Sequence, residues 1–213
     1  MFEDTGGYSV RAFDARRDLL GTQLYCAAIN DRIDTDQSGL SGANLWRVSP
    51  QALFEQDARV YAIGWRDSVV AGCYVKRAGE ALFDIKGLFK GHFIDRIAPR
   101  LVVYEAVVDT ARRYTDNIHF QAAIRVYPRE WRDRTGRLRQ ENLASRRIFE
   151  GEIGFVADSA PITHAWREDY VDSHLRDSLE PGRNIYRNVM YRSTGDTIRL
   201  ARDRLAALAA AAA

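Results

Sequence analysis

The chain has 213 residues, of which 46% are hydrophobic and 28% are charged, and its formal net charge is +2. This balance is typical of a soluble globular protein that buries one sizeable core, and it indicates one domain. The small net charge excludes attraction to nucleic acid or membranes by the overall field, although a local cluster can still bind an anion. No run of about 18 apolar residues occurs, and the N-terminus lacks a signal-peptide layout, so we expect a cytoplasmic protein without membrane contact.

The 2 cysteines and 4 histidines are the residues to consider first for redox or metal chemistry. Cys26 and Cys73 lie in apolar segments on separate predicted elements, which favours buried thiols in a reducing compartment. The histidines do not show metal-ligand spacing with cysteines or carboxylates. We therefore expect no metal.

The N-terminal part of the chain predicts a strand, two helices and a loop. Residues 8–13 alternate as a strand, and residues 19–33 carry apolar side chains at helical spacing. Residues 34–44 are rich in Asp, Ser and Gly, which is typical of a loop. Ser49 followed by Pro50 is typical of a capped helix start.

The middle of the chain predicts a three-strand meander, then a helix and a strand. Residues 59–65 and 68–76 are typical of two strands joined by a tight hairpin, and residues 81–89 supply a third strand. An apolar stripe predicts a helix over 101–114, and residues 119–127 predict the next strand. Because a helix crosses between them, the strands on either side of it should be parallel neighbours.

The segment 142–155 is the most informative part of the chain. Asn142 is a preferred N-cap residue, Ile148 and Phe149 supply an apolar helix face, and Gly154 suits a left-handed helix end. A strand at Phe155, a final strand over 184–192 packed after it, and a helix over 197–208 are the last elements predicted.

This segment resembles the last conserved segment of the GNAT acyltransferases. In that family an Asn follows the central strand, a small residue comes three positions later, an aromatic residue lies near the middle of the helix, and Gly-Phe ends it. The matching residues are Asn142, Ser145, Phe149, Gly154 and Phe155. The resemblance implies a GNAT-like α/β fold of three layers, with a mixed, mostly antiparallel central sheet flanked by helices. We expect a single domain over residues 1–213, with a core at 8–192 and an appended helix at 196–213.

The resemblance also implies an activity, the transfer of an acyl group from a thioester to the amine of a small molecule. The donor would be acyl-CoA, or the acyl-phosphopantetheine of an acyl carrier protein. In the family the sheet opens near the strand that here contains Val126, and the pantetheine arm is held there. The donor-binding candidates on this basis are Val126, Asn142, Ser145 and Phe149.

The loop before the helix at 101–114 departs from the family pattern. GNAT enzymes usually place Gly-x-Gly or Gly-x-Ala there, so that backbone N–H groups can reach the pyrophosphate of CoA. Here Ala98 and Arg100 stand in place of the glycines, and Pro99 removes one N–H. The basic side chains Lys90, Arg96 and Arg100 are therefore phosphate-binding candidates, and the alternative is that they only solvate a helix end.

The predicted helix after Asn142 also lacks the usual proton donor. Many GNAT enzymes have a Tyr there whose hydroxyl protonates the leaving thiolate, but this chain has Phe149, with one extra residue before Gly154. Tyr104, Tyr127 or Tyr186 could substitute, and each has the alternative role of a packing residue.

A general base is expected from the meander, because a protonated amine must lose a proton before it attacks a thioester. Asp84 lies among apolar residues on a predicted strand, where burial would make its carboxylate a better base. Glu80, His92 and His119 are further candidates. The alternatives are a salt-bridged Asp84 and histidines that are structural or exposed.

An insertion at 128–141 carries many arginines and Trp131. A charge run is usually a solvated face, and Glu130, Asp133 and Glu141 partly neutralise this one. The alternative is a phosphate-binding surface for CoA, a carrier protein or an RNA backbone, with the Trp available for stacking.

Three classes of function compete. The leading hypothesis is an N-acyltransferase. A GNAT-fold binding or regulatory module without catalysis is the alternative, favoured by Phe149 and by the missing glycines. An RNA-binding or aminoacyl-tRNA-binding protein is disfavoured by the near-neutral charge and by the absence of a recognised motif. The acceptor and the oligomeric state, monomer or homodimer, are not determined by the sequence.

Overall fold

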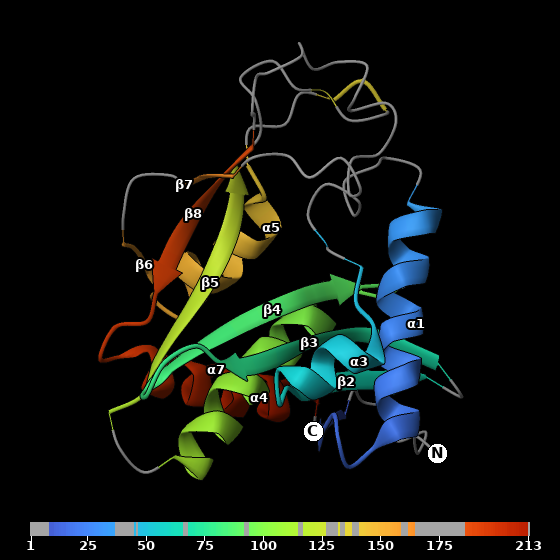
Figure 1. The fold of residues 1–213 in the computed structure, drawn as a ribbon. Coiled ribbons are helices and arrows are strands. Elements are labelled where there is room, and N and C mark those ends of the chain that lie inside the picture. Colours follow the sequence, from blue (N-terminus) through green and yellow to red (C-terminus); the bar gives the residue numbers. More distant parts are fainter. Residues whose placement is uncertain are drawn as a thin grey trace.

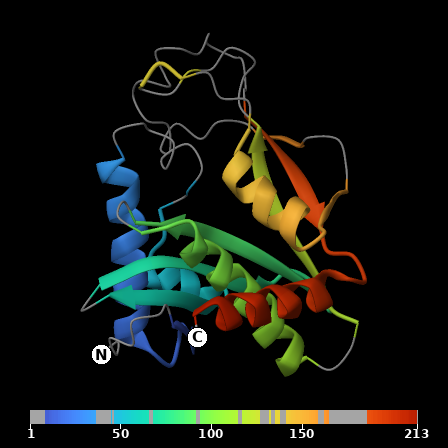
Figure 2. The ribbon, with the colours of Figure 1, turned by 180° about the vertical axis from the view of Figure 1, so that it is seen from behind.

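The computed structural model describes residues 9–36, 45, 47–65, 68–91, 94–114, 117–126, 132, 135–137, 141–158, 162–164 and 186–212. In these residues one sheet carries helices on both faces (Figure 1 and Figure 2), which confirms the predicted three-layer α/β fold. The strands are β1 (Val10–Asp14), β2 (Arg59–Trp65), β3 (Ser68–Arg77), β4 (Leu82–Lys90), β5 (His119–Val126), β6 (Val156–Ala157), β7 (Ile162–His164) and β8 (Tyr186–Arg192). The helices are α1 (Leu19–Thr35), α3 (Pro50–Glu55), α4 (Ile97–Arg113), α5 (Leu143–Arg146), the π-helix η1 (Arg147–Glu152) and α7 (Thr197–Ala212).

The sheet is mixed and mostly antiparallel, with the order β1-β2-β3-β4-β5-β8-β6 and with β7 paired to β8. Among the described strands only β4 and β5 pair in parallel, so the prediction that the helix between them makes them parallel neighbours is confirmed. The final strand differs from the prediction, because β8 lies between β5 and β6 instead of beyond β6. β6 has only two residues, and β8 supplies the long antiparallel partner that β5 needs.

β4 and β5 pair only over their first residues and then diverge, as Figure 1 shows. The pairing covers Leu82–Asp84 against His119–Gln121, although β4 continues to Lys90 and β5 to Val126. A bulge in the β3–β4 pairing, between Gly72 and Tyr74, bends this region of the sheet. Beyond Asp84 and Gln121, the facing edges of β4 and β5 therefore carry backbone groups that do not pair with one another.

A glycine in β4 makes this bend possible. Gly87 has a φ of +63°, a left-handed conformation that a side chain would strain. An added Cβ there would lie 2.5 Å from the hydroxyl oxygen of Tyr25, and that hydroxyl donates to the Gly87 carbonyl at 2.9 Å. The first helix thus fixes the curvature of β4.

Two apolar cores, one on each face of the sheet, hold the layers together. On one face α1 and α3 cover β2 and β3 through fully buried residues such as Tyr25, Ile29 and Leu53. On the other face α4 packs on the central strands, and α7 packs on α4. Figure 2 shows α4 and α7 in front of the sheet from this side.

Helix starts follow the predicted capping chemistry. The Ser49 hydroxyl accepts from the Ala52 N–H at 3.1 Å, as expected for the start of α3. α4 begins at Ile97, four residues before the predicted boundary, because Pro99 fits a first helical turn and the Asp95 carboxylate caps it.

The segment from Asn142 forms a helix that changes to π geometry. The Asn142 side chain accepts from Ser145 N at 3.3 Å, and Gly154 ends the segment with a φ of +69°, so both predicted ends are confirmed. Between them the Ile153 N–H donates to the Ile148 carbonyl, five residues back, at 3.2 Å. The π turn accommodates the extra residue that the sequence places before Gly154.

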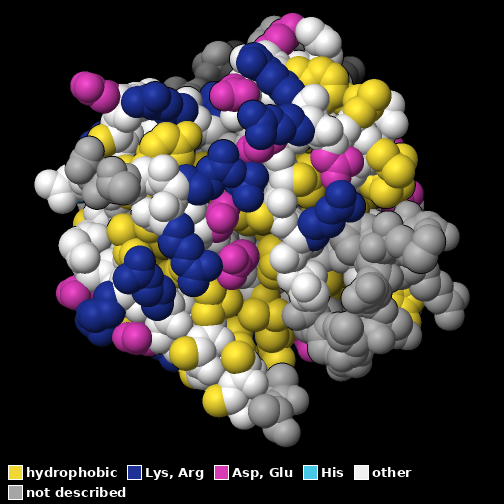
Figure 3. Space-filling model, turned by 90° about the horizontal axis from the view of Figure 1, so that it is seen from below, with side chains coloured by type: hydrophobic (Ala, Val, Ile, Leu, Met, Phe, Trp, Pro, Cys, Tyr) yellow, Lys and Arg dark blue, Asp and Glu magenta, His cyan; other side chains and the backbone are white. Residues whose placement is uncertain are grey.

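Other expectations concern burial, membranes and surface charge. Cys26 and Cys73 are buried, and burial raises the pKa of the Cys26 thiol to about 11, as expected for unreactive thiols. Across the described part of the chain, every helix is too short or too polar to cross a bilayer. On the face shown in Figure 3, Lys and Arg side chains are interspersed with Asp and Glu side chains.

Candidate functional site

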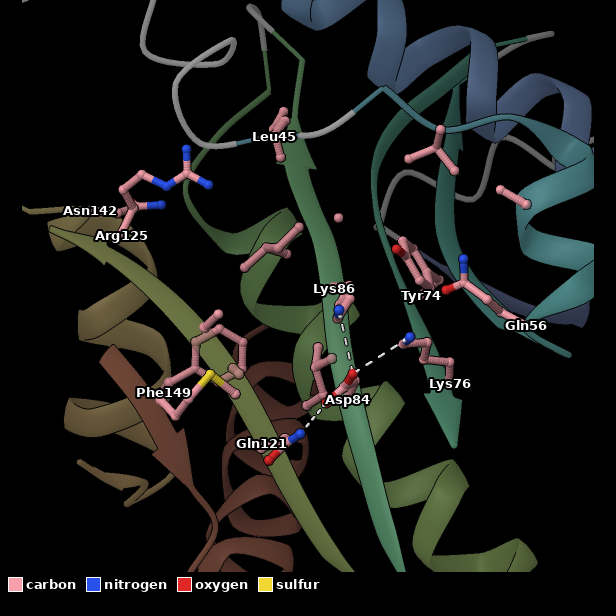
Figure 4. A pocket seen from close by; sticks show the side chains of 18 of the residues that line it. Leu45, Gln56, Tyr74, Lys76, Asp84, Lys86, Gln121, Arg125, Asn142 and Phe149 are labelled. Carbon is pink, nitrogen blue, oxygen red and sulfur yellow. Dashed lines mark hydrogen bonds and ion pairs between the residues drawn. The ribbon is translucent and has the colours of Figure 1, made fainter. Parts of the chain in front are cut away.

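A cleft of about 740 Å³ opens where β4 and β5 diverge (Figure 4). Its walls come from β3, β4, β5, β8, α3, the chain that leads into α3, and the start of the Asn142 helix. The polar residues of the lining are Arg47, Gln56, Tyr74, Lys76, Asp84, Lys86, Gln121, Arg125, Asn142 and Arg192. The apolar lining includes Leu45, Val48, Ile85, Leu88, Phe149 and Met190.

Asp84 lies at the apex of the cleft, where the strands part. It is opposite Gln121 in the last paired position of the two strands, and the Gln121 amide donates to its Oδ1 at 2.5 Å. The residue is only 7% exposed. The structure therefore places the predicted base candidate Asp84 in the lining of the cleft, at the last pair of the two strands.

Two lysines compensate the charge of this carboxylate. The Nζ atoms of Lys86 and Lys76 lie 3.4 Å and 3.9 Å from Oδ2 of Asp84, as the dashed lines of Figure 4 show. Two ammonium groups carry six N–H donors, whereas Asp84 has two oxygens and one already accepts from Gln121. The apex is thus a cationic surface around one buried carboxylate, which corresponds to the salt-bridged alternative considered for Asp84.

Tyr74 is a lining residue that the sequence reasoning missed. Its phenol is part of the cleft wall, and burial, followed by the charge of Asp84, raises its pKa to about 12. Tyr74, Lys76 and Gln121 lie on one face of their strands because side chains alternate along a strand. The sequence predicted which strands are neighbours but not their register, so it did not show that these side chains face the same cleft.

The donor-binding candidates near the Asn142 helix fall in two groups. Asn142 and Phe149 line the cleft, and the Phe149 ring packs on Phe155 with ring centroids 5.2 Å apart. Val126 ends β5 and Ser145 lies in the first turn of the helix, and neither is part of the lining. Phe149 lies in the π turn η1.

Two of the three basic candidates before α4, Lys90 and Arg100, already have partners inside the chain. The Arg100 guanidinium donates from Nε to Glu152 at 2.8 Å and from Nη1 to the Arg96 carbonyl at 2.8 Å. The Lys90 ammonium donates to the Ile94 carbonyl at 3.0 Å. Burial, followed by the charges of Arg32 and Arg96, lowers the pKa of Lys90. Arg96 is exposed.

The remaining catalytic candidates lie away from the cleft or outside the described residues. Tyr104 is buried on α4 with its hydroxyl bonded to Glu152, and burial, followed by that hydrogen bond, raises its pKa. Glu80 is exposed in the turn between β3 and β4, and His119 is exposed at the start of β5. Neither Tyr104 nor Glu80 is part of the cleft lining. The Tyr104 side chain contacts η1 through Glu152, and Glu80 lies in the turn between β3 and β4.

Several predictions fall on residues that the structure does not describe. These are His92, Tyr127, the side chain of Tyr186, Trp131 and most of the insertion 128–141. Among the described residues, no three His, Cys, Asp or Glu side chains are grouped as metal ligands would be.

Solved structures with a similar fold include acyltransferases. An acyl-CoA N-acyltransferase from Pseudomonas aeruginosa matches with a TM-score of 0.53 and 10% identity, over 88% of this chain and 100% of that one. A ribosomal-protein-alanine N-acetyltransferase from Brucella melitensis matches with 0.52 and 13% identity, over 87% and 98%. A protein from Desulfovibrio desulfuricans assigned to the GNAT family of acetyltransferases matches with 0.51 and 13% identity, over 86% and 98%.

Comparison of sequences finds no relative of this chain, although comparison of structures does. No protein-family model matches the chain, and no curated protein matches its sequence. At identities of 10–13% the similarity concerns the fold, which covers almost all of each relative. The chain is therefore a divergent protein with the GNAT fold.

Proposed function

We propose that the protein is an N-acyltransferase that moves an acyl group from a thioester, acyl-CoA or an acyl carrier protein, to the amine of a small molecule. The observation that carries the proposal is the cleft at the divergence of β4 and β5, with Asp84 and Gln121 at its apex. An extended pantetheine arm fits between two strands whose inner edges do not pair with one another. Its amide groups would bond to that backbone as an additional strand does.

The reaction needs little covalent chemistry from the protein. The amine nitrogen attacks the thioester carbonyl, a C–N bond forms, and the C–S bond breaks to release a thiol. One proton leaves the amine and one reaches the sulfur, so the chain has to position the reactants and move protons. Asp84 is the candidate for the first proton, and the Tyr74 hydroxyl, which also lines the cleft, is a candidate for the second.

The charge of the cleft bears on the acceptor. Lys76 and Lys86 lie beside Asp84, and Arg125 is a buried member of the same lining. Cations in a partly desolvated cleft favour a ligand with a negative group. The acceptor in this proposal is an amine that also carries a carboxylate or phosphate, with the acid group at the lysines and the amine at Asp84.

A binding module without catalysis is the second candidate. Phe149 stands where many relatives of the fold carry a proton-donating Tyr, and its ring is 3% exposed in an apolar contact with Phe155. A phenyl ring cannot donate a proton. In this alternative the cleft would hold a thioester or a similar ligand without turnover.

A thiol-release assay separates the two candidates. Acetyl-CoA and an acetylated carrier protein are offered with pairs of amines that differ only in an acid group, such as an amino acid and its amide. Acyl transfer that requires the amine supports the enzyme, and preference for the acid-bearing member supports the acceptor class. Saturable donor binding without thiol release from any pair supports the binding module.

A further inference from the structure

The N-terminus of α4 is already occupied by a carboxylate of the same chain. Oδ1 of Asp95 accepts from the N–H of Ile97 at 2.8 Å and from the N–H of Ala98 at 3.2 Å. These are the first two N–H groups of the helix, and Pro99 in the third position has none. The donors that a helix N-terminus offers to an anion are thus satisfied from within.

The side chains around this turn are also committed. Arg100 is bound to the Glu152 carboxylate and to the Arg96 carbonyl, and the same carboxylate accepts from the Tyr104 hydroxyl. The ion pair joins the first turn of α4 to η1, so Arg100 would have to leave Glu152 before it could contact a phosphate. Of the two arginines at the turn, Arg100 is therefore paired with Glu152, while the Asp95 carboxylate lies beside the exposed Arg96.

The charge of Asp95 also disfavours a diphosphate at this turn. Asp95 is exposed at the helix end, and a diphosphate there would meet its negative charge at short range. The side chain would have to rotate away and give up both hydrogen bonds before the ligand could use the N–H groups. Each of these steps costs binding free energy that a glycine loop would not require.

We propose that this protein recognises its donor through the acyl-pantetheine arm in the cleft, without a diphosphate contact at the N-terminus of α4. The inference rests on the proposed function, because it names the donor class of the same cleft. It extends that class to pantetheine thioesters that carry no nucleotide, and it assigns Asp95 as the residue that removes the preference for CoA. The contacts left to the donor are the backbone edges of β4 and β5 and the apex at Asp84.

Direct binding tests this without requiring turnover. Isothermal titration calorimetry of the full chain with acetyl-CoA and with acetyl-pantetheine, in the absence of an amine, should give dissociation constants within about threefold of each other. Acetyl-CoA binding tighter by more than about thirtyfold would show a nucleotide or diphosphate contact and overturn the inference. Absence of binding by either thioester would overturn it as well.

Variants of Asp95 test the cause. Asp95→Gly exposes the N–H groups of Ile97 and Ala98 and removes the charge, so acetyl-CoA should bind about tenfold tighter while acetyl-pantetheine is unchanged. Asp18→Gly is the control, because Asp18 also caps a helix, α1, through the Gly21 N–H at 2.8 Å, and it is not part of the cleft lining. Unchanged or weaker acetyl-CoA binding by Asp95→Gly would contradict the role of Asp95.

These outcomes are distinct from failure of the proposed function. Equal binding of both thioesters without transfer to any amine would leave the donor inference in place and remove the enzyme. Transfer from acetyl-CoA with a large loss on truncation to acetyl-pantetheine would do the reverse.

Discussion

Asp84 is the residue on which the proposed chemistry depends most, because its surroundings admit two roles. It is buried at the apex with Gln121 on one oxygen, as a positioned base would be. It also lies at ion-pair distance from two lysines, as a structural counter-ion would. If Asp84 is the base, removal of its charge should affect turnover. If it is a structural counter-ion, removal of its charge should affect only folding and the preference of the cleft for charged ligands.

The first prediction separates these roles of Asp84. Asp84→Asn keeps an oxygen for the Gln121 amide but cannot take a proton, so kcat should fall about 100-fold or more while acceptor binding persists. Steady-state kinetics and calorimetry of the acceptor measure the two effects. Asp203→Asn, on the exposed face of α7, is the control and should leave both unchanged. Full activity of Asp84→Asn would remove this residue from the reaction.

A second prediction concerns the acid group of the acceptor. Lys86→Gln retains a polar side chain but removes one ammonium group beside Asp84. The KM for an amino acid acceptor should rise about tenfold, whereas the KM for its amide should change little, since only the first forms the ion pair. Equal changes for both acceptors would show that Lys86 does not recognise an acid group.

At the level of elements, the curvature of β4 controls the cleft. β4 bends at Gly87, and the Tyr25 hydroxyl of α1 holds the bend through the Gly87 carbonyl. The π turn η1 is a second local irregularity at the cleft. It accommodates the extra residue before Gly154, and both Asn142 and Phe149 line the cleft. A bulge and a π turn each interrupt a regular element without ending it.

The third prediction tests the bend of β4. Gly87→Ala places a Cβ 2.5 Å from the Tyr25 hydroxyl and imposes a positive φ on a non-glycine residue. We expect a loss of about 2 kcal/mol or more in the free energy of unfolding, together with weaker thioester binding. Urea denaturation and calorimetry measure these quantities.

Gly151→Ala is the matched control for that change. An added Cβ at Gly151 meets no atom within 4 Å, and no positive φ is recorded there. Its stability should remain within about 1 kcal/mol of the parent. Equal losses of stability in both variants would show that the positive φ of Gly87 and its contact with Tyr25 do not require a glycine.

At the scale of the whole molecule, both cores contain buried phenols. Tyr25, Tyr61 and Tyr104 are almost fully buried, and burial is the largest cause that raises the pKa of each above 10. The Tyr74 pKa is raised to about 12 in the cleft wall. Both layers therefore depend on phenols that remain neutral when the chain is folded.

The fourth prediction follows from these raised pKa values. Below pH 10 the tyrosines are neutral in both the folded and the unfolded chain, so their stabilising contribution is fully present. Above pH 10 the unfolded chain releases the protons and the folded chain retains them, so the free energy of unfolding should fall as pH rises. Each such tyrosine contributes about 1.4 kcal/mol per pH unit in this range.

Urea denaturation between pH 8 and pH 11.5, with tyrosinate absorbance recorded in parallel, checks this expectation. Cys26, whose pKa is raised to about 11 from 9.0, adds a decline that starts one pH unit earlier. Constant stability up to pH 11.5, with the phenols ionising in the folded chain, would contradict the burial described for them.

The order and type of the main elements were predictable from the sequence. Alternation and helical spacing predicted β1 to β5 and α1, and the Asn142 cap and Gly154 end of the last predicted GNAT segment match the structure. These features are local, because a cap, a turn or a period involves residues within a few positions of one another. The parallel pairing of β4 and β5 also followed, because a helical crossover imposes it.

The tertiary structure alone decided the site. Asp84 and Gln121 meet through a strand pairing of residues 37 positions apart, and Arg100 meets Glu152 across 52 positions. No pattern in the sequence indicates that Glu152 would take Arg100, or that β8 would enter between β5 and β6. The chain sets its periods and helix ends by short-range chemistry, whereas packing across the sheet determines which charges meet. That is why the sequence suggested the fold, while the structure was needed to find the lysines of the cleft and the carboxylate that closes the helix N-terminus.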